Sequence, residues 1–143
     1  MQEAARVIGL QIHVLNASTS NEIDAAFATL ARDRLDALQI APDGFFTSRR
    51  EQLVNLAARE RIPAAYNRDY VVAGGLMGYA TNAADTYRQI GIYVGRILRG
   101  EKPSDLPVQQ PTRFEFVINL KTAKALGLAI PETLLATADE VIQ

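Results

Sequence analysis

The fold class is indicated by residues 36–66, which read DALQIAPDGFFTSRREQLVNLAARERIPAAY. Short apolar runs at 36–41 and 64–66 are bounded by proline or glycine, as strands buried in a sheet often are. Between them, leucines and alanines recur at helical spacing, so we expect a helix from about 48 to 62. A strand, a helix and a second strand in succession predict a parallel pair joined by a helical crossover.

The same alternation continues on both sides of this stretch. The capping-box pattern, Thr or Ser followed three residues later by Glu, starts two of the expected helices, at Thr19 and at Ser48. The apolar spacing predicts strands at 11–17, 36–41, 64–66, 76–80 and 113–118, and helices at 20–34, 48–62, 82–99, 121–126 and 131–143. This order predicts an α/β fold with a parallel, doubly wound sheet flanked by helices.

The length of 143 residues is that of one domain, and we expect a single α/β domain over 1–143. Three prolines in 101–111 exclude a helix or a central strand there, so this segment is expected to be an extended connector. Residues 112–143 then form a strand–helix tail. The first residues read as the end of an amphipathic helix closed by Gly9, and not as an export signal, so we expect the later part of a longer protein.

Composition narrows the function classes. A net charge of -1 gives no electrostatic footprint for nucleic acid, and no apolar run is long enough to insert into a membrane. The chain has no cysteine, and its one histidine, His13, falls in an expected strand. The phosphate-binding loop, the dinucleotide-binding glycine motif and the nucleophile elbow are missing. We therefore expect no catalytic residues, no metal and no cofactor, in a protein that is not an enzyme.

Ligands of such sheets bind outside the carboxyl ends of the strands. That rule selects three loops, at 16–20, 42–48 and 66–70. The first is rich in hydroxyls and amides at a helix start, which suits a carboxylate or phosphate, although Thr19 serves equally as a simple helix cap. In the second, Asp43 joins two phenylalanines and a helix start, a set that suits a zwitterion with an apolar side chain, although Asp43 is equally suited to a turn.

Several blocks of the sequence resemble one known family. They are AGGLMGY at 73–79, RILRGEKP at 96–103, DLPVQQPT at 105–112, FEFVINLKTAKALG at 114–127 and LLATADEV at 134–141. In these blocks, and over essentially the whole chain, the sequence is similar to the substrate-binding proteins of bacterial ABC transporters, of the type I periplasmic-binding class. The closing blocks are the most specific, because prolines, a glycine and a long ordered string of residue types coincide there.

The resemblance implies a protein of two α/β lobes, joined by a hinge that closes on a ligand in the cleft between them. This chain would be most of the second lobe, with segments that cross the hinge. The resemblance also implies capture of a small, amino-acid-like solute and its delivery to an ABC permease, and some relatives bind aromatic amino acids. The full-length protein would work in the periplasm or at the cell surface.

The candidate ligand-binding residues are the loop positions that both the strand-end rule and the implied lobe arrangement place in the cleft. They are Ser18, Asp43, Phe45, Phe46, Tyr66, Asn67 and Tyr79. In this hypothesis Asp43 binds the ligand ammonium, and Ser18 or the helix start at 47–48 binds its carboxylate. Phe45, Phe46 or Tyr66 packs on the ligand side chain.

Other hypotheses stay open. The same lobe architecture suits a ligand-sensing regulatory domain, a small flavodoxin-like enzyme would require a bound cofactor, and the isolated chain would be inactive if the ligand needs both lobes. For the isolated chain we also expect a homodimer, because a sheet without its neighbouring strand exposes an edge and a lobe without its partner exposes an apolar face. A more specific form of this hypothesis exchanges the tail at 113–143 between two copies.

Overall fold

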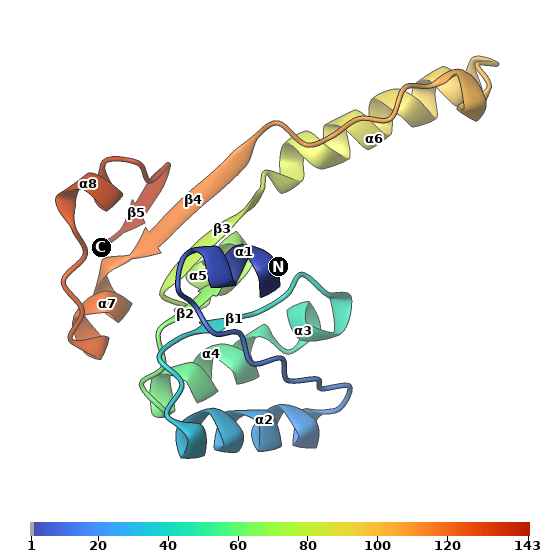
Figure 1. The fold of residues 1–143 in the computed structure, drawn as a ribbon. Helices are drawn as coiled ribbons and strands as arrows, with labels where there is room; N and C mark the ends of the chain where they lie inside the picture. The colour runs from blue at the N-terminus through green and yellow to red at the C-terminus, as the bar shows by residue number, and fades with distance from the viewer. Residues whose placement is uncertain (1) are drawn as a thin grey trace. The chain divides into compact units, whose positions relative to one another are not determined.

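A computed structural model describes residues 2–143, which form two compact units (Figure 1). The first unit ends at Leu35, and the second runs from Asp36 to Gln143. The sheet belongs wholly to the second unit. That 1–143 behaves as a single domain stays a prediction.

The first unit contains the helices α1 (Gln2–Val7) and α2 (Ser20–Asp33). The predicted capping box of α2 is confirmed: the N–H of Glu22 donates to Thr19 Oγ1 at 3.3 Å, and the N–H of Thr19 donates to Glu22 Oε2 at 3.2 Å. These bonds satisfy backbone donors that a helix start otherwise leaves without partners. The helix buries one face, made of Ile23, Phe27 and Leu30.

The predicted strand at 11–17 is wrong, because the structure has no strand there. A strand is stable only when its backbone groups pair in a ladder. The ladders of the described sheet use residues from Leu38 onward and none from 11–17. His13 is accordingly exposed and outside any strand. The apolar run alone therefore could not predict a strand without knowledge of a neighbour to pair with.

The second unit is built on one five-stranded sheet with the strand order β1-β2-β3-β4-β5. The strands are β1 (Leu38–Gln39), β2 (Ala64–Tyr66), β3 (Met77–Thr81), β4 (Phe114–Asn119) and β5 (Glu140–Ile142). All neighbouring pairs are parallel except β3 and β4, which are antiparallel. The predicted α/β fold, with a mostly parallel sheet flanked by helices, is confirmed.

Helices alternate with these strands along the second unit. They are α3 (Gly44–Ser48), α4 (Arg50–Arg59), α5 (Arg68–Val72), α6 (Ala83–Leu98), α7 (Leu120–Leu126) and α8 (Glu132–Leu135). Helix α5 lies against β3 and β4, and α4 lies beside α5, so the core of the unit includes the buried residues Leu53, Val71 and Val117. Within residues 2–143, no helix combines the length and the apolar content that crossing a membrane requires.

The predicted helix at 48–62 is observed as α4, but the separate short helix α3 precedes it, and the predicted capping box at Ser48 is wrong. Asp43 caps α3, which begins one turn earlier than the sequence indicated. Ser48 lies in the last turn of α3, where its hydroxyl donates to the carbonyl oxygen of Phe45 at 2.6 Å. Arg49 joins α3 to α4 without a side-chain cap. Aspartate is a preferred residue at the N-cap, and this cap decides where the helical segment starts.

The predicted helix at 131–143 is mostly wrong, because only α8 is helical and β5 follows it. Asp139 joins the edge of β4: its N–H donates to the carbonyl oxygen of Phe116 at 2.8 Å, and the N–H of Phe116 donates to its carboxylate at 2.8 Å. The edge of β4 offers a parallel ladder to β5. This tertiary pairing outweighs the local helical pattern.

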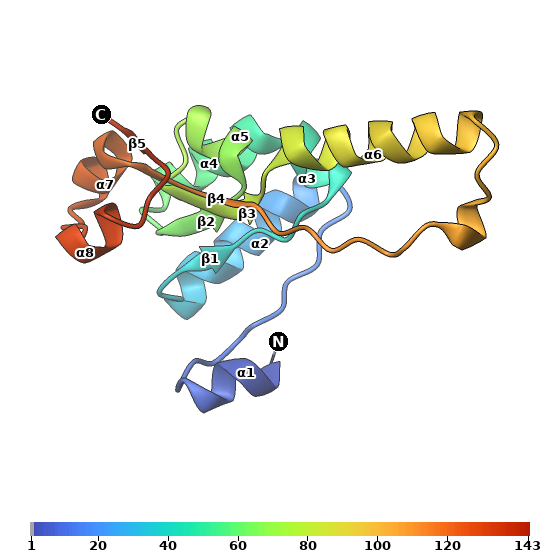
Figure 2. The ribbon, with the colours of Figure 1, turned by 90° about the horizontal axis from the view of Figure 1, so that it is seen from above.

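Residues 82–113, termed the arm, leave the sheet after β3 and return to it at β4 (Figures 1 and 2). The outward half is α6, and the returning half is the connector at 101–111, whose only regular structure is a 3-10 turn at Pro103–Asp105. The two ends meet where the N–H of Asn82 donates to the carbonyl oxygen of Arg113 at 3.0 Å. Residues 114–119 of the tail pair with β3 of the same chain.

Candidate ligand-binding site

Strands β1, β2 and β3 end at the same edge of the sheet. They are parallel and in register, with Leu38 opposite Ala64 and Ala65 opposite Met77. The chain leads from β1 into α3 and from β2 into α5. Loops at the carboxyl ends of parallel strands are where α/β sheets bind ligands. This edge is therefore the candidate site, and the starts of α3 and α5 form it.

Asp43 is held in place by the helix that it caps. Its Oδ1 accepts hydrogen bonds from the N–H of Phe45 at 2.7 Å and of Phe46 at 3.4 Å. The residue is exposed, so a positioned carboxylate is available to a ligand ammonium. The rings of Phe45 and Phe46 are half-buried, with centroids 5.6 Å apart and planes tilted by 52°. An anionic group and apolar ring surface thus occur within one short helix.

The predicted helix start at 47–48 is wrong, and that these residues bind a ligand carboxylate stays a prediction. Thr47 and Ser48 lie in the last turn of α3 and not at its start. The Thr47 hydroxyl donates to the carbonyl oxygen of Asp43 at 2.8 Å, and the N–H of Thr47 donates to the same oxygen at 3.0 Å. These groups are used within α3, so they do not form the free N–H cluster of a helix start.

The rings of Tyr66 and Tyr70 are stacked, with centroids 5.0 Å apart. Burial raises the pKa of Tyr66, and its neighbour Tyr70 raises it further. Burial also raises the pKa of Tyr70, while a hydrogen bond with Thr47 lowers it and the nearby Asp43 carboxylate raises it. Tyr70 therefore links α5 to α3 beneath the candidate site. The sequence did not single out Tyr70, because its position in a short helix gives no periodic signal.

Asn67 caps α5, where its Oδ1 accepts a hydrogen bond from the N–H of Asp69 at 3.1 Å. Its backbone lies directly over β3: a Cβ at Gly78 would stand 2.9 Å from both the carbonyl carbon and the oxygen of Asn67. A glycine is therefore required at 78 for α5 to start this close to the sheet. The next residue, Arg68, forms an ion pair with Glu140 of β5 at 2.7 Å, which ties the start of α5 across the sheet.

Tyr79 lies on the face of the sheet opposite to Gly78 and Tyr66, because side chains alternate along a strand. It is 64% exposed and pairs across the ladder with Phe116. Its ring stacks on Phe114, with centroids 5.5 Å apart, and meets Phe116 edge-on at 6.2 Å. The alternation of the strand predicts that Phe114 and Phe116 share a face, but only the register brings them to Tyr79.

Ser18 lies in the first unit, immediately before the cap of α2. The residue is exposed, and its N–H donates to Glu22 Oε2 at 2.6 Å. The structure brings together the candidates of α3, β2 and α5, which are Asp43, Phe45, Phe46, Tyr66 and Asn67. Tyr79 belongs to a separate aromatic cluster.

The site offers groups for binding a small molecule. The carboxylate of Asp43 suits a cation, and the rings of α3 suit an apolar side chain. Among residues 2–143, no three carboxylate or imidazole side chains gather in a way that would hold a metal ion. Ligand sites of this kind are apolar with a few polar groups that orient the ligand.

Comparison with known proteins gives a match over nearly the whole chain. Residues 1–142 match the family described as ABC transporter substrate binding protein. A tyrosine-binding protein from Clostridioides difficile (strain R20291) is 28% identical over 115 residues, which are 78% of this chain and 32% of that protein.

Solved structures agree with this match. A conserved domain protein from Vibrio cholerae superposes with a TM-score of 0.89 at 26% identity, over 97% of this chain and 47% of that one. The ABC domain from Streptococcus pneumoniae in complex with L-Trp gives 0.89 at 27% identity, over 99% and 49%. A ligand-free, open structure of a substrate-binding protein with adhesive properties from Clostridium difficile gives 0.66 at 25% identity, over 99% and 47%. The chain thus spans about a third to a half of the length of these relatives.

Proposed function

This chain belongs to the ABC transporter substrate binding protein family, and we propose that it supplies one wall of a cleft that captures a small, amino-acid-like solute. The observation that carries this proposal is the position of Asp43 at the carboxyl edge of the sheet, next to the phenylalanines of α3 and close to Tyr70. A carboxylate beside aromatic rings is complementary to the ammonium and the side chain of an aromatic amino acid. The names of two relatives, a tyrosine-binding protein and a domain in complex with L-Trp, support this class of ligand.

In this proposal Asp43 accepts the ligand ammonium, and Phe45 and Phe46 pack on the ligand side chain. Tyr66 is only 3% exposed, and its role is to hold Tyr70 in place by stacking on its ring. Asn67 offers its amide at the start of α5. Ser18 is retained as the candidate for the ligand carboxylate and Tyr79 as a candidate for further aromatic contact.

The whole protein is proposed to have two lobes, with the ligand in the cleft between them and a hinge that closes on it. The share of the relatives that this chain spans supports this, because roughly the length of another lobe remains. Membership of the family supports delivery of the solute to an ABC permease, in a bacterium, and a location in the periplasm or at the cell surface. The isolated chain is proposed to form a homodimer.

The absence of tryptophan from the chain allows a direct test. L-tryptophan is titrated with the protein while its fluorescence is excited beyond the tyrosine absorption band, so that only the ligand emits. We expect a saturable change in emission, reversed by competition with L-tyrosine. No saturable change up to millimolar ligand contradicts the proposal that this wall binds the ligand without the other lobe.

The role of Asp43 is tested by Asp43→Asn, which removes the charge but keeps a side chain that caps helices equally well. Loss of a charge-assisted bond is expected to weaken binding by about 1.5–3 kcal/mol, which is roughly ten- to a hundredfold. Asp105→Asn, in the 3-10 turn of the connector, is the matched control and should leave the affinity unchanged. Equal affinity of both variants would remove Asp43 from the site.

A further inference from the structure

A free amino acid carries a carboxylate beside its ammonium, and a charge that enters a binding site without a partner costs free energy. The site described above offers the carboxylate of Asp43 to the ammonium and the rings of α3 to the side chain. Ser18 offers a hydroxyl, which can donate a hydrogen bond but cannot neutralise a negative charge. A cation at the carboxyl edge of the sheet would complete the set of groups that an amino acid needs.

Arg50 is the first residue of α4, a helix that runs from this edge back to the start of β2. It precedes the buried residues Leu53, Val54 and Ala57 by three, four and seven positions, so it continues their face of the helix. That face packs inward, because α4 lies beside α5 and a Cβ at Gly74 would stand 3.6 Å from Val54. Side chains of a helix tilt toward its N-terminus, so the Arg50 side chain leads from this face toward the carboxyl edge.

The charges of Asp43 and Arg50 both act on the hydroxyl of Tyr70. Burial raises the pKa of Tyr70, and its hydrogen bond with Thr47 lowers it. The Asp43 carboxylate raises this pKa further, whereas the Arg50 guanidinium lowers it. Within residues 2–143, neither Asp43 nor Arg50 forms an ion pair, with the other or with a third residue. Two opposite charges therefore lie around one side chain without neutralising each other.

We propose that Arg50 binds the carboxylate of the solute while Asp43 binds its ammonium. This inference rests on the proposed function and names the groups that recognise the main chain of the solute, so the site selects a free amino acid with both charged groups. A guanidinium suits this role because its N–H groups form two parallel hydrogen bonds to a carboxylate. The two charged groups of an amino acid are attached to one carbon atom, so their partners have to be neighbours, as the cap of α3 and the start of α4 are.

Two indole compounds test the role of Arg50: L-tryptophan carries both charged groups, and tryptamine lacks the carboxylate. Each is titrated with the whole chain while only its own emission is excited, since the chain has no tryptophan. The wild-type chain should bind L-tryptophan roughly ten- to a hundredfold more tightly than tryptamine, because tryptamine loses the charge-assisted bonds to Arg50. Arg50→Gln should weaken L-tryptophan by a similar factor, so that the preference over tryptamine is lost.

Arg59→Gln is the matched control, because Arg59 lies at the other end of α4 and is paired with Glu60. It makes the same change in net charge and should leave the affinities for both compounds unchanged. Arg50→Lys keeps the charge but loses the planar fork of donors, so it should retain part of the preference for L-tryptophan. Urea unfolding of each variant checks that the fold is intact.

Each contrary result points to a different failure. If the wild-type chain binds neither compound, this wall does not bind the solute without the other lobe, and the inference about Arg50 fails with it. If Arg50→Gln binds L-tryptophan as tightly as the wild-type chain does, the proposed function stands and the inference alone is overturned. If Arg50→Gln weakens tryptamine as much as L-tryptophan, Arg50 does not act on the carboxylate, which also overturns the inference.

Discussion

Tyr66 and Tyr70 stack with their ring planes 14° apart, which joins strand β2 to helix α5 within the core. Both rings are almost fully buried. Gly75 makes room for them, since a Cβ there would stand 2.9 Å from the Tyr66 ring and from the carbonyl oxygen of Tyr70. Stacking adds about 0.5–1.5 kcal/mol to the free energy of burying the two rings. The pair therefore fixes α5 on the sheet and, with it, the position of Asn67 at the site.

The Tyr70 hydroxyl leads to the first prediction. Tyr70→Phe keeps the stacked ring but removes the hydrogen bond with Thr47, so the free energy of unfolding should fall by about 0.5–1.5 kcal/mol. Urea unfolding measures the change. Tyr79→Phe is the control, because the ring of Tyr79 is mostly exposed, and its effect should stay within about 0.5 kcal/mol. Equal stability of the two variants would contradict a role for the Tyr70 hydroxyl in joining α3 to α5.

Three local cap signals in the sequence predicted helix ends correctly, whereas the capping box at Ser48 did not form. These three caps satisfy backbone groups of their own helix, and the structure has them where the sequence indicated them. They are Thr19 with Glu22 in α2, Asn82 in α6, and Asn119 with Gly127 in α7. A cap depends on residues within one turn, so it can be recognised without knowledge of the fold.

Strand pairing could not be predicted in the same way. The apolar run at 11–17 lacks a ladder in the described sheet, and the helical pattern at 131–143 gives way to a ladder with β4. In both cases the formation of a strand depends on whether a partner backbone is available, and this is decided by the tertiary fold rather than by the local sequence. The same limit applies to the site. The strand-end rule selected Asp43 and Asn67. The position of Tyr70 follows only from the packing of α5, and the ring partners of Tyr79 follow only from the register of β4.

Asn82 gives a second prediction, because it both caps α6 and contacts β4. Its Oδ1 accepts a hydrogen bond from the N–H of Asp85 at 2.7 Å, and its amide nitrogen donates to Glu115. Asn82→Ala loses both bonds and should lower the free energy of unfolding by about 1–2 kcal/mol.

Asn82→Asp separates the two roles, because it keeps the cap but sets a second carboxylate beside Glu115. The like charges repel, so the stability of this variant relative to wild type should rise as the pH falls and the carboxylates become protonated. Urea unfolding at several pH values measures this. If the difference in the free energy of unfolding between the two proteins does not change with pH, the carboxylate of Glu115 does not interact with residue 82.

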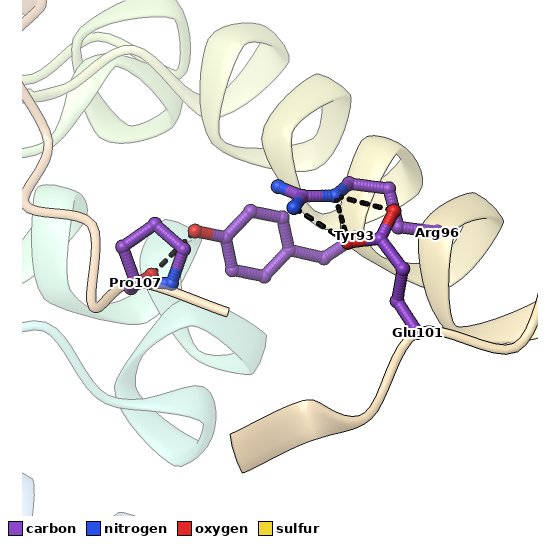
Figure 3. A network of polar contacts seen from close by, with 4 residues as sticks. All are labelled: Tyr93, Arg96, Glu101 and Pro107. Carbon is purple, nitrogen blue, oxygen red and sulfur yellow. Dashed lines mark hydrogen bonds and ion pairs between the residues drawn. The ribbon is translucent and has the colours of Figure 1, made fainter. Parts of the chain in front are cut away.

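The contacts that hold the connector on α6, termed the clasp, are the bonds of Arg96 to Glu101 and of Tyr93 to Pro107 (Figure 3). They give a third prediction, on the pKa of Glu101. The hydrogen bonds from Arg96 hold the pKa of Glu101 below its ordinary value of 4.5. A carboxyl whose pKa is lower in the folded state contributes stability above pH 4.5, and this contribution is lost as the pH falls through the folded-state pKa. Arg96→Gln should move the titration midpoint of Glu101, followed by NMR of its side-chain carboxyl carbon, upward toward 4.5.

Arg99→Gln is the control for the clasp, because Arg99 lowers the pKa of Glu101 only weakly and from a distance. Its effect on the midpoint should be clearly smaller than that of Arg96→Gln. High salt should reduce the shift in the wild-type chain, since both partners of the clasp are at the surface. If Arg96→Gln leaves the midpoint where it is, the clasp does not form in solution.

Gly78 and Gly91 give the last prediction. Substitution by alanine should lower the free energy of unfolding at Gly78 and raise it at Gly91. At Gly78 an added Cβ would stand 2.9 Å from the backbone of Asn67 and 3.0 Å from Val71. The backbone of Asn67 cannot shift without a cost in free energy, so Gly78→Ala should lower the free energy of unfolding by about 1–3 kcal/mol. At Gly91, inside the exposed helix α6, a Cβ would meet nothing within 4 Å, and alanine is the better helix former by about 1 kcal/mol. Gly91→Ala should therefore stabilise the chain when urea unfolding is measured at concentrations too low for association. A stabilising effect at Gly78 would mean that α5 does not start directly over β3, and the position of Asn67 at the site would have to be revised with it.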